Sequence, residues 1–233
     1  MPNPETQLNT TSQQTRFLAA RESVLKSCRA LADQGFLAGT GGNVALRADD
    51  QHFCVTPSAT DYYSMASDDI CVLRLSDPKQ IVGERKPSVE SGLHASILKA
   101  RPDCTASIHT HQPIASAYTL LAKPLNVRQD THRELLGSVI PCAGYAPSGT
   151  SWLAGKVAHK VKPNVHAYLM RNHGAVCVGS TLEIAMERVI SLEQACADFF
   201  ERQLAKRRSR LSDGLVDVVR TTLAVASSVS ESS

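Results

Sequence analysis

The sequence predicts a fold of the α/β or α+β class, in which helices pack around a central sheet. Segments with apolar residues at helical spacing are mixed with short apolar or alternating segments, but strand and helix do not follow one another in a strict repeat. At 233 residues the chain can bury roughly 70% of its unfolded surface, enough for a full hydrophobic core. Its 42% hydrophobic and 20% charged residues indicate neither disorder nor a membrane role.

The first predicted elements are a helix, a hairpin and a third strand. Residues 15–35 carry apolar side chains at helical spacing and end on Gly35, a common helix terminator. Residues 43–48 and 52–56 alternate in polarity around an Asp-Asp turn, which predicts a β-hairpin. The apolar run 69–75 predicts a further strand.

The middle of the chain contains two predicted helices and two predicted strands. A Pro-Ser pair is typical of a helix start, so we expect a helix over residues 87–98 that stops before Pro102. Residues 104–111 read as a buried strand, and 113–122 as a short helix. Residues 138–145 form another predicted strand.

The last part of the predicted domain is a helix, a bent pair of strands and a long helix. Residues 151–162 are amphipathic, which predicts a helix. Residues 166–180 read as two strand segments bent at Asn-His-Gly, positions 172–174. Residues 181–204 form a long amphipathic helix, and Thr181 is a favourable N-terminal cap.

The folded domain is expected to span residues 15–206. Residues 1–14 are polar and are predicted to be disordered, because they offer too little apolar surface to offset their ordering entropy. Residues 207–233 end in a serine-rich stretch and are predicted to be a helical or disordered tail.

Charge and composition exclude several classes of function. The formal net charge is only +3, and a single short stretch, 202–210, is locally basic, so a nucleic-acid partner is not expected. No window approaches eighteen apolar residues, so no membrane partner is expected. The start of the chain lacks a signal-peptide pattern, and seven cysteines stand singly, which favours reduced thiols in the cytoplasm.

Three histidines form a candidate metal site. His109 and His111 are two residues apart on a predicted strand, so their side chains leave the same face about 7 Å apart. Such a pair binds a metal in some proteins and serves as hydrogen-bonded strand residues in others. His173 lies at the predicted bend beside a glycine, and three imidazoles with an open fourth position are typical of a catalytic zinc-type site. Glu90 at a helix start is either a solvated carboxylate or a fourth ligand that substrate displaces, which frees it as a general base.

Five short motifs give the chain a resemblance to a known family. The stretches "GTGGNVALR", "TPS", "KPSVE", "HTH" and "NHG" resemble, in order and approximate spacing, the class II aldolase and adducin-head family over roughly residues 20–200. The resemblance implies a class II aldolase-like catalytic domain over 15–206. Its central sheet would be mixed, mainly antiparallel and nine-stranded, with helices on both faces. It also implies a homotetramer with active sites between subunits.

The resemblance assigns roles to individual residues. The metal ligands would be His109, His111 and His173, with Glu90 as the ligand or base, and the ion would be Zn²⁺ or Mn²⁺ or another divalent metal. Apart from the resemblance, His94 stands four residues after Glu90, a spacing that can gather a metal on one helix face, but it is expected to be a supporting or core histidine. The anionic part of a small-molecule substrate would be bound by a loop and two hydroxyl groups, namely Gly42, Asn43, Ser58 and Ser88.

Two residues depart from the pattern of the sugar-phosphate aldolases. Ala59 stands where they commonly have a flexible glycine, and Val89 where they have a hydroxyl donor. A charge-assisted hydrogen bond contributes about 1.5–3 kcal/mol, so the loss of one can change substrate choice. Either other groups hold the phosphate, or the substrate anion is a carboxylate.

The stretch 127–135 is a second candidate for anion binding. It places Arg128, Asp130, His132 and Arg133 close together in the sequence. Arg128 could bind a substrate carboxylate. By the resemblance, Asp130 falls near the position of a catalytic tyrosine of the sugar aldolases, and His132 could act as the proton donor. The alternative is that this stretch is an exposed polar helix start.

The sequence therefore supports three functional hypotheses. The first is a divalent-metal-dependent carbon–carbon lyase that cleaves a small hydroxylated, sugar phosphate-like substrate through a metal-stabilised enediolate. The second is a decarboxylase of a hydroxylated aromatic or sugar-acid carboxylate on the same scaffold. The third is a non-catalytic, adducin-like interaction module. Aldolase, decarboxylase and epimerase chemistry are not separated by these motifs.

Overall fold

The computed structural model describes residues 15–37 and 39–228, so the segment 1–14, predicted to be disordered, lies outside the described residues. The described chain contains an eight-stranded sheet in the order β4-β3-β2-β1-β5-β10-β9-β8. All neighbouring strands in it are antiparallel except β8 and β9. The strands of this sheet are β1 (Asn43–Arg47), β2 (His52–Val55), β3 (Cys71–Arg74), β4 (Gln80–Val82), β5 (Ala106–Thr110), β8 (Cys142–Ala143), β9 (Ala167–Met170) and β10 (Gly174–Gly179).

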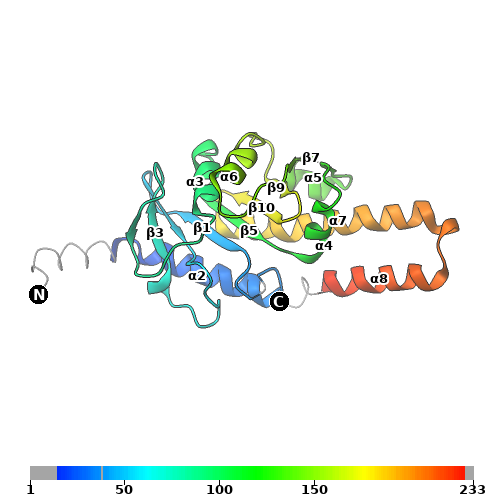
Figure 1. Ribbon diagram of the computed structural model, residues 1–233, viewed down its shortest axis with the longest axis horizontal. Helices are drawn as coiled ribbons and strands as arrows, with labels where there is room; N and C mark the ends of the chain where they lie inside the picture. The colour runs from blue at the N-terminus through cyan, green and yellow to red at the C-terminus, as the bar shows by residue number, and fades with distance from the viewer. Residues whose placement is uncertain (1–14, 38, 229–233) are drawn as a thin grey trace, which may run out of the picture.

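Helices cover both faces of the sheet (Figure 1). The helix α2 and the first half of α7 lie on one face, and α3 and α6 lie on the other. The bounds of the α-helices are α2 (Leu18–Asp33), α3 (Ser91–Ala100), α4 (Pro113–Thr119), α5 (Asp130–Leu136), α6 (Ser151–Ala158), α7 (Leu182–Arg207) and α8 (Asp213–Ser228). Two short 3-10 helices are η1 (Ser67–Asp69) and η2 (Arg208–Arg210).

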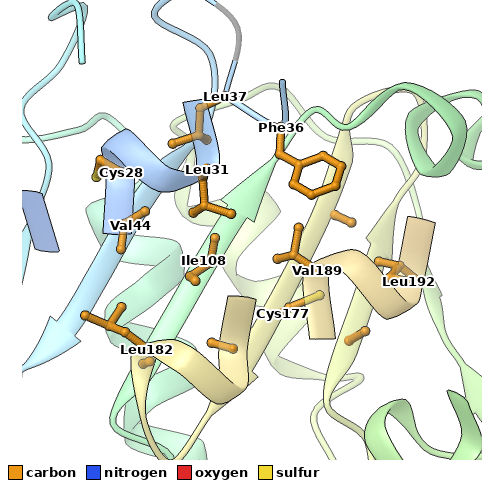
Figure 2. Packing of buried hydrophobic residues seen from close by; sticks show 14 of the residues in the cluster. Cys28, Leu31, Phe36, Leu37, Val44, Ile108, Cys177, Leu182, Val189 and Leu192 are labelled. Atoms are coloured by element: carbon orange, nitrogen blue, oxygen red, sulfur yellow. The ribbon is translucent and has the colours of Figure 1, made fainter. Parts of the chain in front are cut away.

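Alternation along the strands divides the core into two layers. Val44 and Ile108 point to the same face and pack with Leu31 of α2 and Val189 of α7 (Figure 2). The residues of β5 on either side of Ile108 point the other way, toward the layer in which Val176 packs with α3 and α6. The metal candidate His109 is one of these, so the site lies on the face covered by α3.

The structure corrects the predicted strand at 138–145. Pro141 has no amide hydrogen, and the segment is divided there into β7 (Val139–Ile140) and β8. The strand β7 pairs with β6 (Leu125–Asn126) in a separate two-stranded sheet. Among the described residues the main sheet therefore has eight strands, not the nine that the resemblance implied.

Other boundaries differ by a few residues. The helix predicted to start at Pro87 starts at Ser91 instead, because residues 88–91 form a turn in which the amide of Ser91 donates to the carbonyl oxygen of Ser88 at 3.0 Å. The helix α7 continues to Arg207, three residues past the predicted end. Beyond it, α8 runs back alongside α7 (Figure 1), so the described part of the tail is helical. No described helix combines the length and the hydropathy that a membrane span requires.

Candidate metal centre

The register of the sheet gathers polar groups on one face. Asn43 of β1 pairs with His109 of β5, and Val176 of β10 pairs with His109 on its other side. Partners in register project to the same face, so the side chains of Asn43 and His109 both point toward α3. The His109 side chain is fully buried, which indicates that it faces the protein interior rather than solvent.

The other two histidines lie just outside the strands. His111 follows the end of β5, and His173 precedes the start of β10, after Asn172 at φ 54°. The backbone of Gly174 passes so close that a Cβ there would lie 2.8 Å from Cδ2 of His111 and 3.2 Å from Cε1 of His109. A glycine at 174 is therefore required for the two loops to bring the histidines together.

The three imidazoles converge on one point. Their candidate ligand nitrogens all lie within 4.8 Å of one another, and Nε2 of His111 lies 3.0 Å from Nε2 of His109. The His109 side chain is buried, that of His173 is 13% exposed, and His111 is exposed. The cluster thus reaches from the interior to the surface, which leaves one side accessible to a small molecule.

Hydrogen bonding fixes the state of the buried imidazole. Nδ1 of His109 donates to the carbonyl oxygen of Ala175 at 2.9 Å, so its proton is on Nδ1 and the lone pair of Nε2 points into the cluster. Burial lowers the pKa of His109, which also favours the neutral, ligating form. Three such nitrogens beside a carboxylate fit a divalent ion with an open coordination position.

Glu90 lies beside the imidazoles at the N-terminal end of α3. Its carboxylate oxygens are 3.1 Å from Nε2 of His109 and 3.3 Å from Nε2 of His173. Asn43 donates to Oε2 at 3.0 Å, and Ser148 donates to Oε1 at 2.8 Å. Burial alone would raise the pKa of Glu90, but the neighbouring histidines and these two donors hold it below its usual value.

A chain of buried hydrogen bonds supports Glu90 from behind. Ser107 of β5 donates to Nδ1 of His94 at 2.8 Å, and Nε2 of His94 donates to Oδ1 of Asn43 at 2.5 Å. Asn43 in turn donates to Glu90. His94 is fully buried and its pKa is lowered by burial. The prediction of a supporting histidine is confirmed.

Of the predicted anion-binding residues, Asn43 and Ser88 make hydrogen bonds with Glu90. Ser58 and Ser88 belong to two loops joined by backbone hydrogen bonds, Ser58 to Lys86 at 2.8 Å and Ser88 to Thr56 at 3.0 Å. Gly42 has φ 84°, and a side chain there would come within 2.7 Å of the carbonyl oxygen of His109. The hydroxyl oxygen of Ser88 accepts a hydrogen bond from the backbone amide of Glu90 at 3.2 Å.

The two departures from the aldolase pattern are visible in the structure. Ala59 has φ 49°, in the left-handed region that favours glycine, so an alanine here adopts a backbone conformation typical of glycine. Val89 is 63% exposed and contacts the loop at Gly149. It therefore presents an apolar surface at the position of the expected hydroxyl donor.

The second candidate stretch lies elsewhere in the chain. Asp130 begins α5 and pairs with Arg133 at 2.5 Å. His132 contacts the hydroxyl of Ser191 at 2.8 Å on α7. Arg128 is exposed and lines a cavity beside α7. Within one chain these residues make no hydrogen bond or ion pair with the described histidine cluster or with Glu90.

One supporting residue has no signal in the sequence. Ser148 is 58 positions from Glu90, in a loop with no motif that the sequence analysis recognised, and its hydroxyl reaches Glu90 only through the fold.

Comparison with known proteins agrees with this geometry. The family model described as "Class II Aldolase and Adducin N-terminal domain" matches residues 22–199. The chain belongs to this family. An L-fuculose phosphate aldolase from Methanococcus vannielii is 32% identical over 170 residues, which is 73% of this chain and 90% of the relative. A 3-oxo-tetronate 4-phosphate decarboxylase from Haemophilus influenzae is 28% identical, over 82% of this chain and 91% of the relative.

A solved structure shows the same fold. An L-fuculose 1-phosphate aldolase superposes with a TM-score of 0.72 at 25% identity, over 88% of this chain and 96% of the other. Class II aldolases depend on a divalent metal, and this chain retains a cluster of three histidines that can hold one. The chain is therefore an enzyme of the lyase class, and the hypothesis of a non-catalytic module is wrong.

Proposed function

We propose that the protein is an aldolase-type carbon–carbon lyase acting on a small, hydroxylated, phosphate-bearing substrate. The observation that carries the proposal is the convergence of three imidazoles beside a buried carboxylate that is held anionic. His109, His111 and His173 would hold Zn²⁺, for which three nitrogen ligands and an open position are typical, or Mn²⁺. When bound, the ion supplies a Lewis acid that offsets negative charge as the carbon–carbon bond breaks.

Glu90 is the residue proposed to move the proton. Its oxygens lie within reach of His109 and His173, so a substrate oxygen entering the cluster would compete with it for that place. A displaced carboxylate with two hydrogen-bond donors, Asn43 and Ser148, stays oriented and can accept or return a proton as a general base. The depressed pKa keeps it ionised before substrate arrives.

The substrate anion is proposed to bind at the adjoining loops. The backbone near Gly42 and the side chains of Asn43, Ser58 and Ser88 are the proposed donors. The positive φ of Ala59 preserves the shape of this cradle, while Val89 removes one hydroxyl from it. The relatives in the comparison are named for phosphorylated substrates, which supports a phosphate as the anion.

A decarboxylase is the second candidate function. The similarity to the Haemophilus influenzae decarboxylase and the apolar surface at Val89 favour it. In that version Arg128 would bind the carboxylate and His132 would return a proton to carbon, with Asp130 beside it. Since the segment 128–132 supplies none of the partners of Glu90 within its own chain, these roles need the same segment of a neighbouring copy.

We accordingly propose a homotetramer with active sites between subunits. Light scattering coupled to gel filtration tests it, and a protein that stays monomeric while fully active would contradict it. The seven cysteines are all free thiols, which supports a reducing compartment such as the cytoplasm.

Two measurements test the proposed function. Protein purified without chelator should contain about one divalent ion per chain, and less than half an equivalent would argue against a catalytic metal. The enzyme is then assayed with ketose 1-phosphates for aldehyde release and with 3-oxo acid phosphates for carbon dioxide release. Release of carbon dioxide without cleavage of any ketose phosphate would replace the aldolase assignment by the decarboxylase.

A further inference from the structure

A cavity of about 520 Å³ lies between α7 and the segment that joins α4 to α5. Its floor is aromatic: Tyr118 is buried, and its ring meets that of Phe199 edge to face at 4.9 Å. The volume lies within the range of roughly 300–1,000 Å³ that is usual for small-molecule sites. None of the three histidines and neither Glu90 nor Asn43 lines it, so it is separate from the metal centre.

The rim of this cavity is strongly basic. Lys123 and Arg128 project from the joining segment, and Arg202 and Lys206 project from α7. The described residues that line the cavity include no aspartate or glutamate. Four like charges around one volume repel one another, and an anion placed between them would relieve that repulsion.

Two of the acidic residues nearby have other partners. Asp130, the acidic residue closest in sequence to Arg128, pairs with Arg133. On α7, Asp198 faces His132 at 3.9 Å. Nζ of Lys123 lies 4.7 Å from the centre of the Phe199 ring, an arrangement that holds the ammonium group at the rim of the cavity. The cationic groups are thus positioned without carboxylate partners from the described chain.

The spacing on α7 shows that one face of the helix is devoted to the cavity. Phe199, Arg202, Gln203 and Lys206 follow the pattern i, i+3, i+4 and i+7, which places all four on the same side. The family model ends at residue 199, so the basic part of this face lies beyond the matched domain. The cavity is therefore built by the C-terminal extension of α7 against the family domain.

We propose that this cavity binds the phosphate group of a small molecule, at a site that shares no residue with the metal centre of its own chain. The proposal rests on the aldolase assignment, in which Arg128 is not needed to bind a substrate carboxylate. The guanidinium groups of Arg128 and Arg202 can each offer two parallel N–H donors to phosphate oxygens. Lys123 and Lys206 add charge at the rim, and the aromatic floor suits the apolar part of a phosphate ester. A dianion matches four uncompensated cations better than a single carboxylate does.

Equilibrium dialysis of inorganic phosphate against the full-length protein tests the proposal, at constant ionic strength maintained with chloride. Arg202→Gln should weaken phosphate binding at this site at least tenfold, equivalent to about 1.4 kcal/mol. Arg210→Gln is the matched control, since Arg210 lies in the same basic stretch but does not line the cavity. It should leave phosphate binding unchanged, and circular dichroism should show that both variants are folded.

A third variant separates the two sites. His111→Ala removes a residue of the metal centre, so phosphate that binds in the cavity should still bind to this variant with the same affinity. Loss of all phosphate binding in His111→Ala would show that the metal centre is the only anion site and would overturn the proposal. Equal weakening by Arg202→Gln and Arg210→Gln would overturn it as well. A wild-type protein that binds no phosphate would also overturn the proposal. If Arg202→Gln then changed the oligomeric state, a second copy of the chain would be the occupant of the cavity.

Discussion

Replacement of Gly174 by alanine tests how the metal centre is assembled. Gly174 starts β10 directly beside β5, and an added methyl group would meet both backbone and imidazole atoms. The nearest atom is the carbonyl oxygen of Thr110, which cannot move freely because Thr110 is paired with Ala175 in the sheet. The next is Cδ2 of His111 at 2.8 Å.

The size of the effect follows from these contacts. To regain an ordinary van der Waals contact, the ring of His111 must move away by about 0.6 Å, with a smaller movement of His109. We expect this displacement of a metal ligand to weaken metal affinity as much as the loss of a hydrogen bond to such a ligand does. That loss weakens metal affinity about 10- to 100-fold. We therefore expect Gly174→Ala to weaken zinc binding by this factor, with an added loss of folding stability of about 1–3 kcal/mol from overpacking.

Competition with a chromophoric chelator measures the zinc affinity, and urea unfolding in the presence of chelator measures the stability separately. Gly155→Ala in α6 is the matched control, because a Cβ at residue 155 would meet no atom within 4 Å. It should retain wild-type zinc affinity. A Gly174→Ala protein that is folded and binds zinc as tightly as the wild type would refute this description of the site.

Three further predictions concern the metal, a buried carboxylate and the ion pair of Arg101 with Asp103. Adding zinc at 100 times its dissociation constant should raise the free energy of unfolding by about 2.7 kcal/mol in the wild type and by much less in His111→Ala. Glu193→Gln should lower the free energy of unfolding, measured in urea, by about 1–3 kcal/mol. The two oxygens of the buried Glu193 carboxylate each accept one backbone N–H at the start of α4, at 2.6 and 2.9 Å. In glutamine one of these oxygens becomes an NH2 group, which cannot accept. The hydrogen bond and charge of Arg101 lower the pKa of Asp103 to about 2, so the stability advantage of the wild type over Asp103→Asn should be full above about pH 4 and shrink as the pH falls toward 2.

Each of these predictions has a contradicting result. Equal stabilisation of the wild type and His111→Ala by zinc would place the ion elsewhere. Glu201→Gln, at an exposed position of the same helix, should be neutral, and a loss equal to that of Glu193→Gln would remove the role of the two amides. A stability difference between the wild type and Asp103→Asn that does not change between pH 6 and pH 2.5 would show that the carboxylate titrates at the same pH in the folded and unfolded states.

The sequence was informative where function depends on spacing along the chain. Two histidines separated by one residue on an apolar strand must share a face, and the structure confirms that His109 and His111 meet. His173 was identified by its position at a bend beside a glycine, and the close approach of Gly174 to the other two histidines gives the physical reason.

Spacing could not reveal contacts that depend on tertiary packing. The link from Ser107 through His94 and Asn43 to Glu90 joins β5, α3 and β1, and it arises from the register of the sheet and the placement of α3. The same limit applies to residues 127–135. Their side chains are close in the sequence, but His132 of α5 contacts Ser191. Arg128, which precedes α5, lines the cavity beside α7 and not the metal centre.

The division of the predicted strand at Pro141 has a different cause. The apolar residues on both sides of the proline satisfy a strand pattern, and a pattern of hydropathy does not register the missing amide hydrogen. The result is two strands of two residues each in different sheets.

X-ray absorption spectroscopy of the zinc-loaded protein measures the coordination most directly. We predict nitrogen or oxygen ligands at about 2.0–2.1 Å and outer-shell scattering from three imidazole rings, with no sulfur ligand. His111→Ala, if it retains zinc at all, should show two rings. A spectrum with two or fewer imidazoles in the wild type, or with sulfur at about 2.3 Å, would contradict the assignment of His109, His111 and His173 to one ion.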